Sequence, residues 1–134
     1  MWMGLAEGCV RAYLRAGIAN EQKGLKMIYE LRTYESPPGK LPALNARFRE
    51  HTLRIFERHG MSVVGFWTYA HGGWSDQLVY MMKFDDMADR DAKWASFGAD
   101  EEWQRIRAET TKDGPITTRI RSDILAPTDY SPLP

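Results

Sequence analysis

Hydrophobic and polar residues alternate along residues 27–34, a pattern that predicts a β-strand with two distinct faces. One face carries Ile28, Glu30, Arg32 and Tyr34, and the other carries Tyr29, Leu31 and Thr33. The sequence Ser-Pro-Pro-Gly at residues 36–39 then predicts a turn, because proline and glycine interrupt regular structure.

Apolar residues next recur at spacings near three and four, which is typical of a helix with one buried face. This pattern predicts a helix over residues 40–58, with an apolar stripe formed by Leu41, Leu44, Phe48, Ile55 and Phe56. Gly60 follows the last turn, where a left-handed conformation commonly ends a helix.

The rest of the chain repeats this order of elements. Residues 61–71 and 77–84 predict two strands joined by a glycine-containing hairpin loop. Asp85 or Asp86 can cap the next helix, and Asp100 can cap a second helical piece. Residues 116–125 predict the last strand, so the order β-α-β-β-α-β indicates an α+β, ferredoxin-like fold with an antiparallel sheet.

Two of the predicted strands are apolar on both faces. In residues 61–71 we place Val64, Phe66 and Ala70 on one face, opposite Val63, Trp67 and Tyr69. Both helices of this fold cover the same face of the sheet. Exposing the other face would forgo roughly 1.5–3 kcal/mol for each large side chain. We therefore predict a homodimer with twofold symmetry, in which two sheets pair face to face as a dimeric α+β barrel.

Residues 1–26 differ from the rest and form a separate N-terminal extension. Their apolar residues recur at helical spacing, so a short amphipathic helix is one interpretation. Such a helix would also offer an alternative to the dimer, because it could cover the second sheet face of its own chain. The other interpretation is a translated segment upstream of a true start at Met27, which leaves residues 27–134 as the domain.

Composition limits the classes of partner that the chain can attract and indicates its cellular compartment. Lysine plus arginine equals aspartate plus glutamate at 18 each, so no net charge attracts nucleic acid or an anionic membrane. The single cysteine forms no intrachain disulfide and is compatible with a reducing compartment. No apolar run approaches the roughly 20 residues that span a bilayer. The sequence thus predicts a cytoplasmic protein with no membrane span and no nucleic-acid partner.

The polar residues of the first strand are the best candidates for a site. A buried charge must be paired, and Glu30 and Arg32 can partly serve each other. If their face points into the barrel, a largely aromatic ligand cavity results, with candidate lining residues Glu30, Arg32, Tyr34, Trp67 and Tyr69. Arg119 and Arg121 join it in one register of the last strand. The alternative is an ion pair that fixes the register of the dimer.

Catalytic signatures are sparse. His51 is the candidate general acid or base, because its ordinary pKa lies near neutrality. His51 and His59 stand eight residues apart on one helix, too far to share a zinc ion, so we expect no metal. The glycines at residues 72–73 fit a hairpin and not a phosphate-binding loop, so we expect no nucleotide and no other cofactor.

Several motifs together resemble the NIPSNAP family. They are Tyr-Glu-Leu-Arg-Thr-Tyr at 29–34, Pro-Gly-Lys at 38–40, His51, His-Gly at 59–60, Gly-Phe-Trp at 65–67, Gln77, Trp103, Ile-Leu-Ala-Pro at 124–127 and Ser-Pro at 131–132. The chain departs from the family pattern at Ala126, before Pro127, and at residues 74–76, before Gln77.

The resemblance implies a ferredoxin-like fold of the dimeric α+β barrel superfamily, without an established reaction. Two kinds of function then compete. One is a homodimer that binds a small anionic or aromatic molecule, including an enzyme of the cofactor-free monooxygenase or isomerase kind. The other is a non-catalytic protein-interaction module. The interior of the barrel distinguishes them: an enclosed cavity of several hundred Å³ near Arg32 favours the first, and a fully packed interior favours the second.

Overall fold

The structure is a computed structural model that describes residues 27–133. Four strands form one antiparallel sheet in the order β2-β3-β1-β4. Their bounds are β1 Ile28–Glu35, β2 Ser62–Thr68, β3 Gln77–Phe84 and β4 Arg119–Leu125. The N-terminal extension, residues 1–26, and the helix predicted in it lie outside the described residues.

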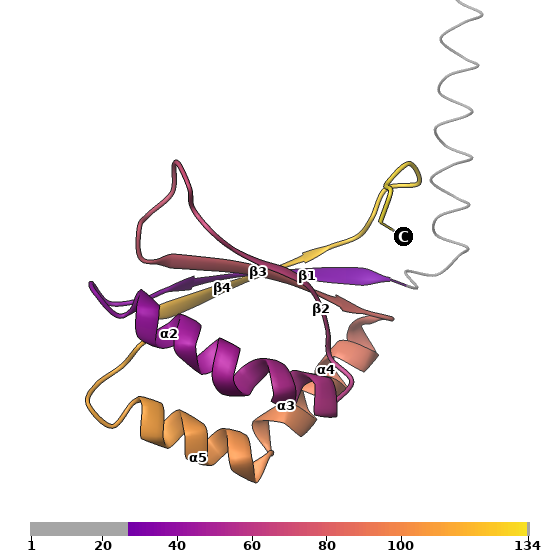
Figure 1. The fold of residues 1–134 in the computed structure, drawn as a ribbon. Helices are drawn as coiled ribbons and strands as arrows, with labels where there is room; N and C mark the ends of the chain where they lie inside the picture. The colour runs from indigo at the N-terminus through magenta and orange to yellow at the C-terminus, as the bar shows by residue number, and fades with distance from the viewer. Residues whose placement is uncertain (1–26, 134) are drawn as a thin grey trace, which may run out of the picture.

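The helices of residues 27–133 lie on one face of the sheet (Figure 1). They are α2 Leu41–Arg47, η1 Phe48–Thr52, α3 Leu53–Arg58, α4 Met87–Gly98 and α5 Glu101–Thr110. The loop between β2 and β3 and the C-terminal segment rise on the opposite side (Figure 1). The α+β, ferredoxin-like fold predicted from the sequence is thus confirmed.

The predicted helix over residues 40–58 is continuous, but its middle turn is wider than an α-helix. Phe48–Thr52 forms a single π-helical turn between α2 and α3. The Thr52 hydroxyl donates to the carbonyl of Arg47, which satisfies an acceptor at this irregular step. Gly60 has a φ of 68° and ends α3 in the left-handed conformation expected of it.

The predicted helix caps are present. Asp86, the second of the two candidates, accepts a hydrogen bond from the backbone N–H of Asp89 at the start of α4. Asp100 does the same for Trp103 at the start of α5. Each carboxylate satisfies a backbone donor that has no partner within its helix.

One assignment of faces was wrong, and a β-bulge explains it. Val63 pairs with Met82, whereas Gly65 pairs with Met81, so the register shifts between them. The additional residue reverses the alternation, and Val63 packs against the core on the same side as Phe66. Trp67 stays on the opposite face, beside Val79.

The core lies between the sheet and the helices. The buried residues of β3 are Leu78, Tyr80, Met82 and Phe84, and alternate residues of that strand are only half-buried. Phe48 and Phe56 from the long helix pack against Tyr80, with ring centroids 5.2 and 6.4 Å apart. Tyr34 of β1 joins this aromatic layer, with its ring centroid 5.8 Å from that of Phe48 and 5.3 Å from that of Tyr80.

Candidate functional site

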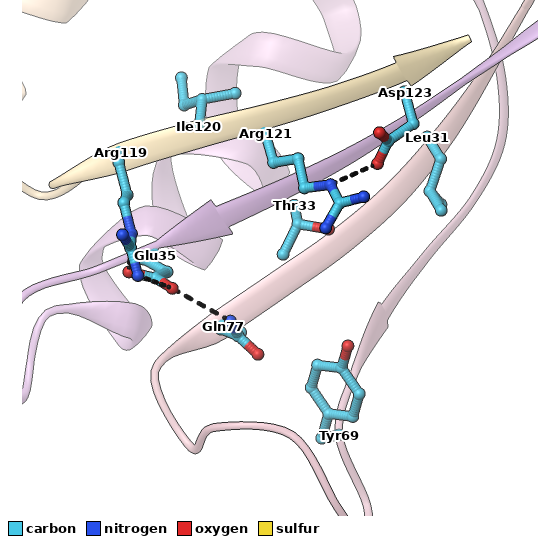
Figure 2. Close-up of a pocket in the computed structure, with 9 residues that line it drawn as sticks. All are labelled: Leu31, Thr33, Glu35, Tyr69, Gln77, Arg119, Ile120, Arg121 and Asp123. Carbon is cyan, nitrogen blue, oxygen red and sulfur yellow. Dashed lines mark hydrogen bonds and ion pairs between the residues drawn. The ribbon is translucent and has the colours of Figure 1, made fainter.

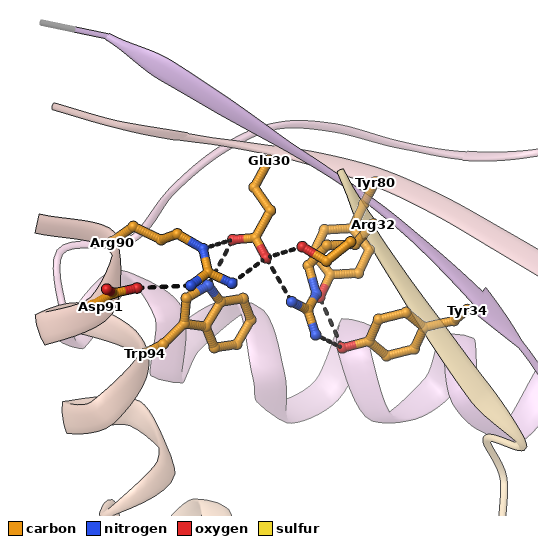
Figure 3. Close-up of polar contacts among 8 residues, drawn as sticks. Glu30, Arg32, Tyr34, Tyr80, Arg90, Asp91 and Trp94 are labelled. Atoms are coloured by element: carbon orange, nitrogen blue, oxygen red, sulfur yellow. Dashed lines mark hydrogen bonds and ion pairs between the residues drawn. The ribbon is translucent and has the colours of Figure 1, made fainter. Parts of the chain in front are cut away.

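Glu30 lies in the middle of β1 on the face covered by the helices, and its side chain is fully buried. Its Oε1 accepts from Arg32 Nη1 at 2.6 Å and from Arg90 Nη2 at 2.9 Å. Its Oε2 accepts from Trp94 Nε1 at 2.7 Å and from Arg90 Nε at 3.1 Å (Figure 3). Ser122 on β4 donates to Oε1 at 2.7 Å, so β1, β4 and α4 all meet at this carboxylate.

These donors keep Glu30 ionised inside the protein. Burial by itself raises the pKa of the Glu30 carboxyl, because low polarity disfavours the charged form. The hydrogen bonds from Arg90, Trp94, Ser122 and Arg32 outweigh burial and lower the pKa from 4.5 to about 2. Glu30 is therefore a fixed negative charge at neutral pH, and its position orients the two arginines.

Arg32 is held against aromatic rings. Its guanidinium carbon lies 4.4 Å from the centroid of the Trp94 ring and 5.5 Å from that of Tyr34. Its Nη2 donates to the Tyr34 hydroxyl at 3.4 Å, and the Tyr80 hydroxyl donates to the same oxygen at 2.9 Å. Burial by itself lowers the pKa of Arg32, but the neighbouring Tyr80, Tyr34 and Glu30 raise it overall, so the guanidinium stays charged.

A cavity of about 690 Å³ lies beside this cluster, between the sheet and helices α4 and α5. Its wall includes Arg32, Tyr34, Arg47, Trp94, Phe97, Trp103, Arg107, Ile116, Thr117 and Arg119. The wall combines aromatic and apolar side chains with four arginines, so apolar surface and positive charge lie next to each other. The volume also falls within the range of known ligand cavities.

Arg47 contributes a further cation to the wall. It is the last residue of α2, immediately before the π-helical turn, and only 7% of it is exposed. Its guanidinium carbon lies 5.1 Å from the centroid of the Trp103 ring, and its Nη1 donates to the Thr110 hydroxyl at 3.4 Å. Burial lowers the pKa of Arg47, because low polarity disfavours the charged form. No carboxylate among residues 27–133 forms an ion pair with it.

The opposite face of the sheet, which we call the open face, holds the other predicted site residues. Trp67 is 50% exposed and Tyr69 is 46% exposed. Tyr69 borders a hollow of about 600 Å³ together with Leu31, Thr33, Glu35, Gln77, Arg119, Arg121 and Asp123 (Figure 2). Its charges are paired, Arg119 with Glu35 at 2.6 Å and Arg121 with Asp123 at 2.7 Å.

The structure therefore corrects the expectation of one shared cavity. Glu30, Arg32 and Tyr34 face the helices, because Trp94 and Arg90 of α4 contact this cluster. Trp67 and Tyr69 lie on the open face, with the sheet between the two groups. Arg121 also belongs to the open face, since it pairs with Thr33 in the register of β1 and β4.

The histidines stand apart from both hollows. His51 lies in the π-helical turn, 3.9 Å from Glu50, and lines neither of them. His59 binds Asp100 through Nε2 and Ser96 through Nδ1, each at 2.7 Å, and thereby joins α3 to α4 and α5. Within the described part of the chain, no three histidine, cysteine or acidic side chains are close enough to hold a metal ion.

Sequence reasoning missed the contributions of Arg47 and Arg90. Arg47 comes three residues after Leu44 and one before Phe48, so it lies on the buried stripe of the helix. A charge on an apolar stripe was the available signal for Arg47. Arg90 stands four residues before Trp94 on α4, and this spacing puts both side chains on one helix face, where both reach Glu30.

Comparison of the sequence with known proteins identifies the family. The family model described as NIPSNAP matches residues 29–132. A mouse protein, Protein NipSnap homolog 3B, is 30% identical over 76 residues, which are 57% of this chain and 30% of that protein. The chain thus spans about a third of the length of that curated relative.

Solved structures give the same result for the fold. A NIPSNAP family protein from Agrobacterium tumefaciens has a TM-score of 0.72 at 26% identity, covering 81% of this chain and 99% of its own. An uncharacterised NIPSNAP-like domain protein from Burkholderia xenovorans has a TM-score of 0.71 at 26% identity, covering 80% and 90%. A putative antibiotic biosynthesis monooxygenase from Chloroflexus aurantiacus reaches 0.51 at 13% identity over 81% and 99%, which shows the fold alone.

Proposed function

This chain belongs to the NIPSNAP family, and we propose that it is a homodimer that binds a small anionic or aromatic molecule. The ligand lies in the cavity between the sheet and helices α4 and α5, and not between two paired sheets. The observation that carries the proposal is the cavity of about 690 Å³ whose wall includes Arg32 stacked on Trp94.

The wall of the cavity has unused hydrogen-bonding capacity. Among residues 27–133, the buried side-chain polar atoms without a partner are Arg32 Nε, Arg47 Nε, Thr117 Oγ1 and Ser36 Oγ. All except that of Ser36 belong to residues that line this cavity. Buried polar groups in proteins are nearly always satisfied, so a cluster of exceptions at one cavity supports a polar ligand there.

Dimerisation is proposed through the open face. Trp67 and Tyr69 expose large aromatic surfaces, and Tyr69 borders the hollow that also holds the ion pairs of Arg119 with Glu35 and of Arg121 with Asp123. Exposed aromatic residues next to charged pairs resemble the apolar centre and polar rim of a protein interface. The second copy would therefore cover the surface that the helices leave bare.

Ligand binding can be tested by thermal shift against a panel of anionic and aromatic metabolites. A ligand that binds only the folded protein raises its apparent stability. Arg32→Ala should abolish the shift, whereas Arg105→Ala, on the exposed side of α5, should keep it. Arg32→Lys keeps a cation beside Glu30 and serves as the folded variant if the alanine protein is unstable.

Either of two results would contradict the proposal. One is a panel in which no compound stabilises the wild-type protein, and the other is a shift that Arg32→Ala and Arg32→Lys leave unchanged. Sedimentation tests the dimer separately, because a wild-type protein that stays monomeric at micromolar concentration contradicts pairing through the open face. Similarity of fold to a monooxygenase does not extend to its reaction, so no catalytic activity is proposed.

A further inference from the structure

Arg47 differs from the other arginines that surround the cluster. Arg32 is neutralised by Glu30, and Arg90 by Glu30 together with Asp91 at 2.8 Å. Arg47 has no acidic partner among the described residues, although it is as buried as many core side chains. A buried cation without a counter-charge is costly, so its retention calls for a negative charge from elsewhere.

The surroundings of Arg47 do not supply that charge. Its polar contact is the neutral hydroxyl of Thr110, its ring contact is Trp103, and its Nε has no partner. Arg107, one of the groups that lower the pKa of Arg47, is also a cation and lines the same cavity. This end of the cavity therefore holds two arginines that no carboxylate among residues 27–133 neutralises.

Aromatic groups stand on both sides of this positive charge. The guanidinium of Arg47 lies over the Trp103 ring, and that of Arg32 lies over the Trp94 ring. Phe97 lies between the tryptophans, with centroids 4.6 Å from Trp103 and 5.6 Å from Trp94. Flat apolar surface next to a cation suits a ligand that is aromatic at one end and anionic at the other.

We propose that Arg47 is the anion anchor of this cavity and that its ligand is an aromatic carboxylate. The carboxylate accepts from the Arg47 guanidinium and lies near Arg107, while the ring lies against Trp94, Phe97 and Trp103. The inference rests on the proposed ligand-binding function and deepens it, because it names the chemical class of the ligand and the residue that selects it. The π-helical turn after Arg47 is the local irregularity that accompanies the site, as such turns often do.

The test compares 2-naphthoate with its uncharged amide, 2-naphthamide, using quenching of tryptophan fluorescence. The wild-type protein should bind the carboxylate at least about tenfold more tightly, because a charge-assisted hydrogen bond is lost in the amide. Arg47→Met keeps the apolar stem and removes the charge, so its preference should fall to about one. Arg105→Met changes the net charge equally at an exposed position and should keep the preference.

A second measurement compares thermal stability without ligand and with 2-naphthoate. Without ligand, Arg47→Met should raise the apparent Tm by about 4 °C, because it removes an unneutralised buried charge. With an aromatic carboxylate at saturating concentration, the order should reverse in favour of the wild type.

The outcomes separate this inference from the proposed function. Equal binding of carboxylate and amide, both lost in Arg32→Ala, would leave the ligand cavity in place and overturn the anchor. The anchor is also overturned if Arg47→Met keeps the preference for the carboxylate. A ligand-free Arg47→Met protein with a lower Tm would show that the native fold already neutralises this charge, which also overturns the anchor. Absence of binding by both probes overturns the anchor, whereas the metabolite panel decides the proposed function by itself.

Discussion

The two faces of the sheet use polar residues in opposite ways. On the face covered by helices, Glu30 is fully buried and accepts hydrogen bonds from four side chains. On the open face, ion pairs such as Arg119 with Glu35 lie at the surface beside exposed aromatic residues. The first arrangement ties strands to a helix, and the second leaves a surface free to meet another molecule. The comparison predicts that polar substitutions on the covered face affect folding, whereas substitutions on the open face affect association.

The largest expected effect comes from removing the buried carboxylate. Glu30→Ala leaves Arg32 and Arg90 without their shared counter-charge inside the protein, so the free energy of unfolding should fall by about 3–5 kcal/mol. Urea denaturation followed by circular dichroism measures this change. Glu57→Ala, an exposed carboxylate on α3, is the matched control and should change stability by less than about 0.5 kcal/mol. A loss below about 1 kcal/mol for Glu30→Ala would contradict the central role of this carboxylate.

Lowering the pH should remove the contribution of Glu30 to the stability of the wild-type protein. The pKa of Glu30 is depressed in the folded state, from 4.5 to about 2. Its contribution is therefore complete above pH 4.5 and is lost as the pH falls towards 2, amounting to about 3 kcal/mol. Glu30→Gln cannot titrate there, so the stability difference between wild type and variant should shrink across this window. A difference that is constant from pH 6 to pH 2 would show that Glu30 is not the titrating group.

A charge on the open face should break association and spare the fold. Trp67→Glu places a carboxylate where the second copy is expected to pack, so the dimer should weaken by about 2 kcal/mol or more. Sedimentation velocity should then show monomers at concentrations where the wild type is dimeric. Leu53→Glu, at an exposed position of α3 on the helical side, should leave the dimer intact. Equal sedimentation of all three proteins would argue against pairing through this face.

A subtler change tests the packing of the open face. A Cβ placed on Gly65 would lie 2.7 Å from Cζ2 of Trp67, so Gly65→Ala must displace the tryptophan ring. We expect the dimer to weaken by about 1 kcal/mol, while monomer folding changes by less. Gly98→Ala is the matched control, because a Cβ there meets no atom within 4 Å. If Gly65→Ala strengthens the dimer, Trp67 does not contribute to the interface in its present orientation.

Local patterns in the sequence were sufficient for the elements and their order. The two-residue period of β1 placed Glu30 and Arg32 on one face, and the helix caps at Asp86 and Asp100 lie where capping chemistry requires. The bulge at residues 63–65 was not predicted. An additional residue in one strand is recognised through its pairing partner, and that partner lies elsewhere in the chain.

The candidate site was predicted in part. Glu30, Arg32 and Tyr34 are grouped as expected, but the hollow beside Arg32 lies on the helical side of the sheet and not between two paired sheets. Trp67 and Tyr69 do not join them, because both strand faces are apolar and periodicity does not tell which face the helices cover.

By itself, the sequence determined the strands, the helices, the pairing of opposite charges on β1 and membership of the NIPSNAP family. These features depend on neighbours a few residues apart or on motifs read directly along the chain. Only the tertiary structure decided that the Glu30 cluster faces the helices and that Arg47 enters the cavity wall with no counter-charge from residues 27–133. Both depend on residues far apart in the chain, 64 positions for Glu30 and Trp94 and 63 for Arg47 and Thr110, which come together only when the helices pack on one face of the sheet.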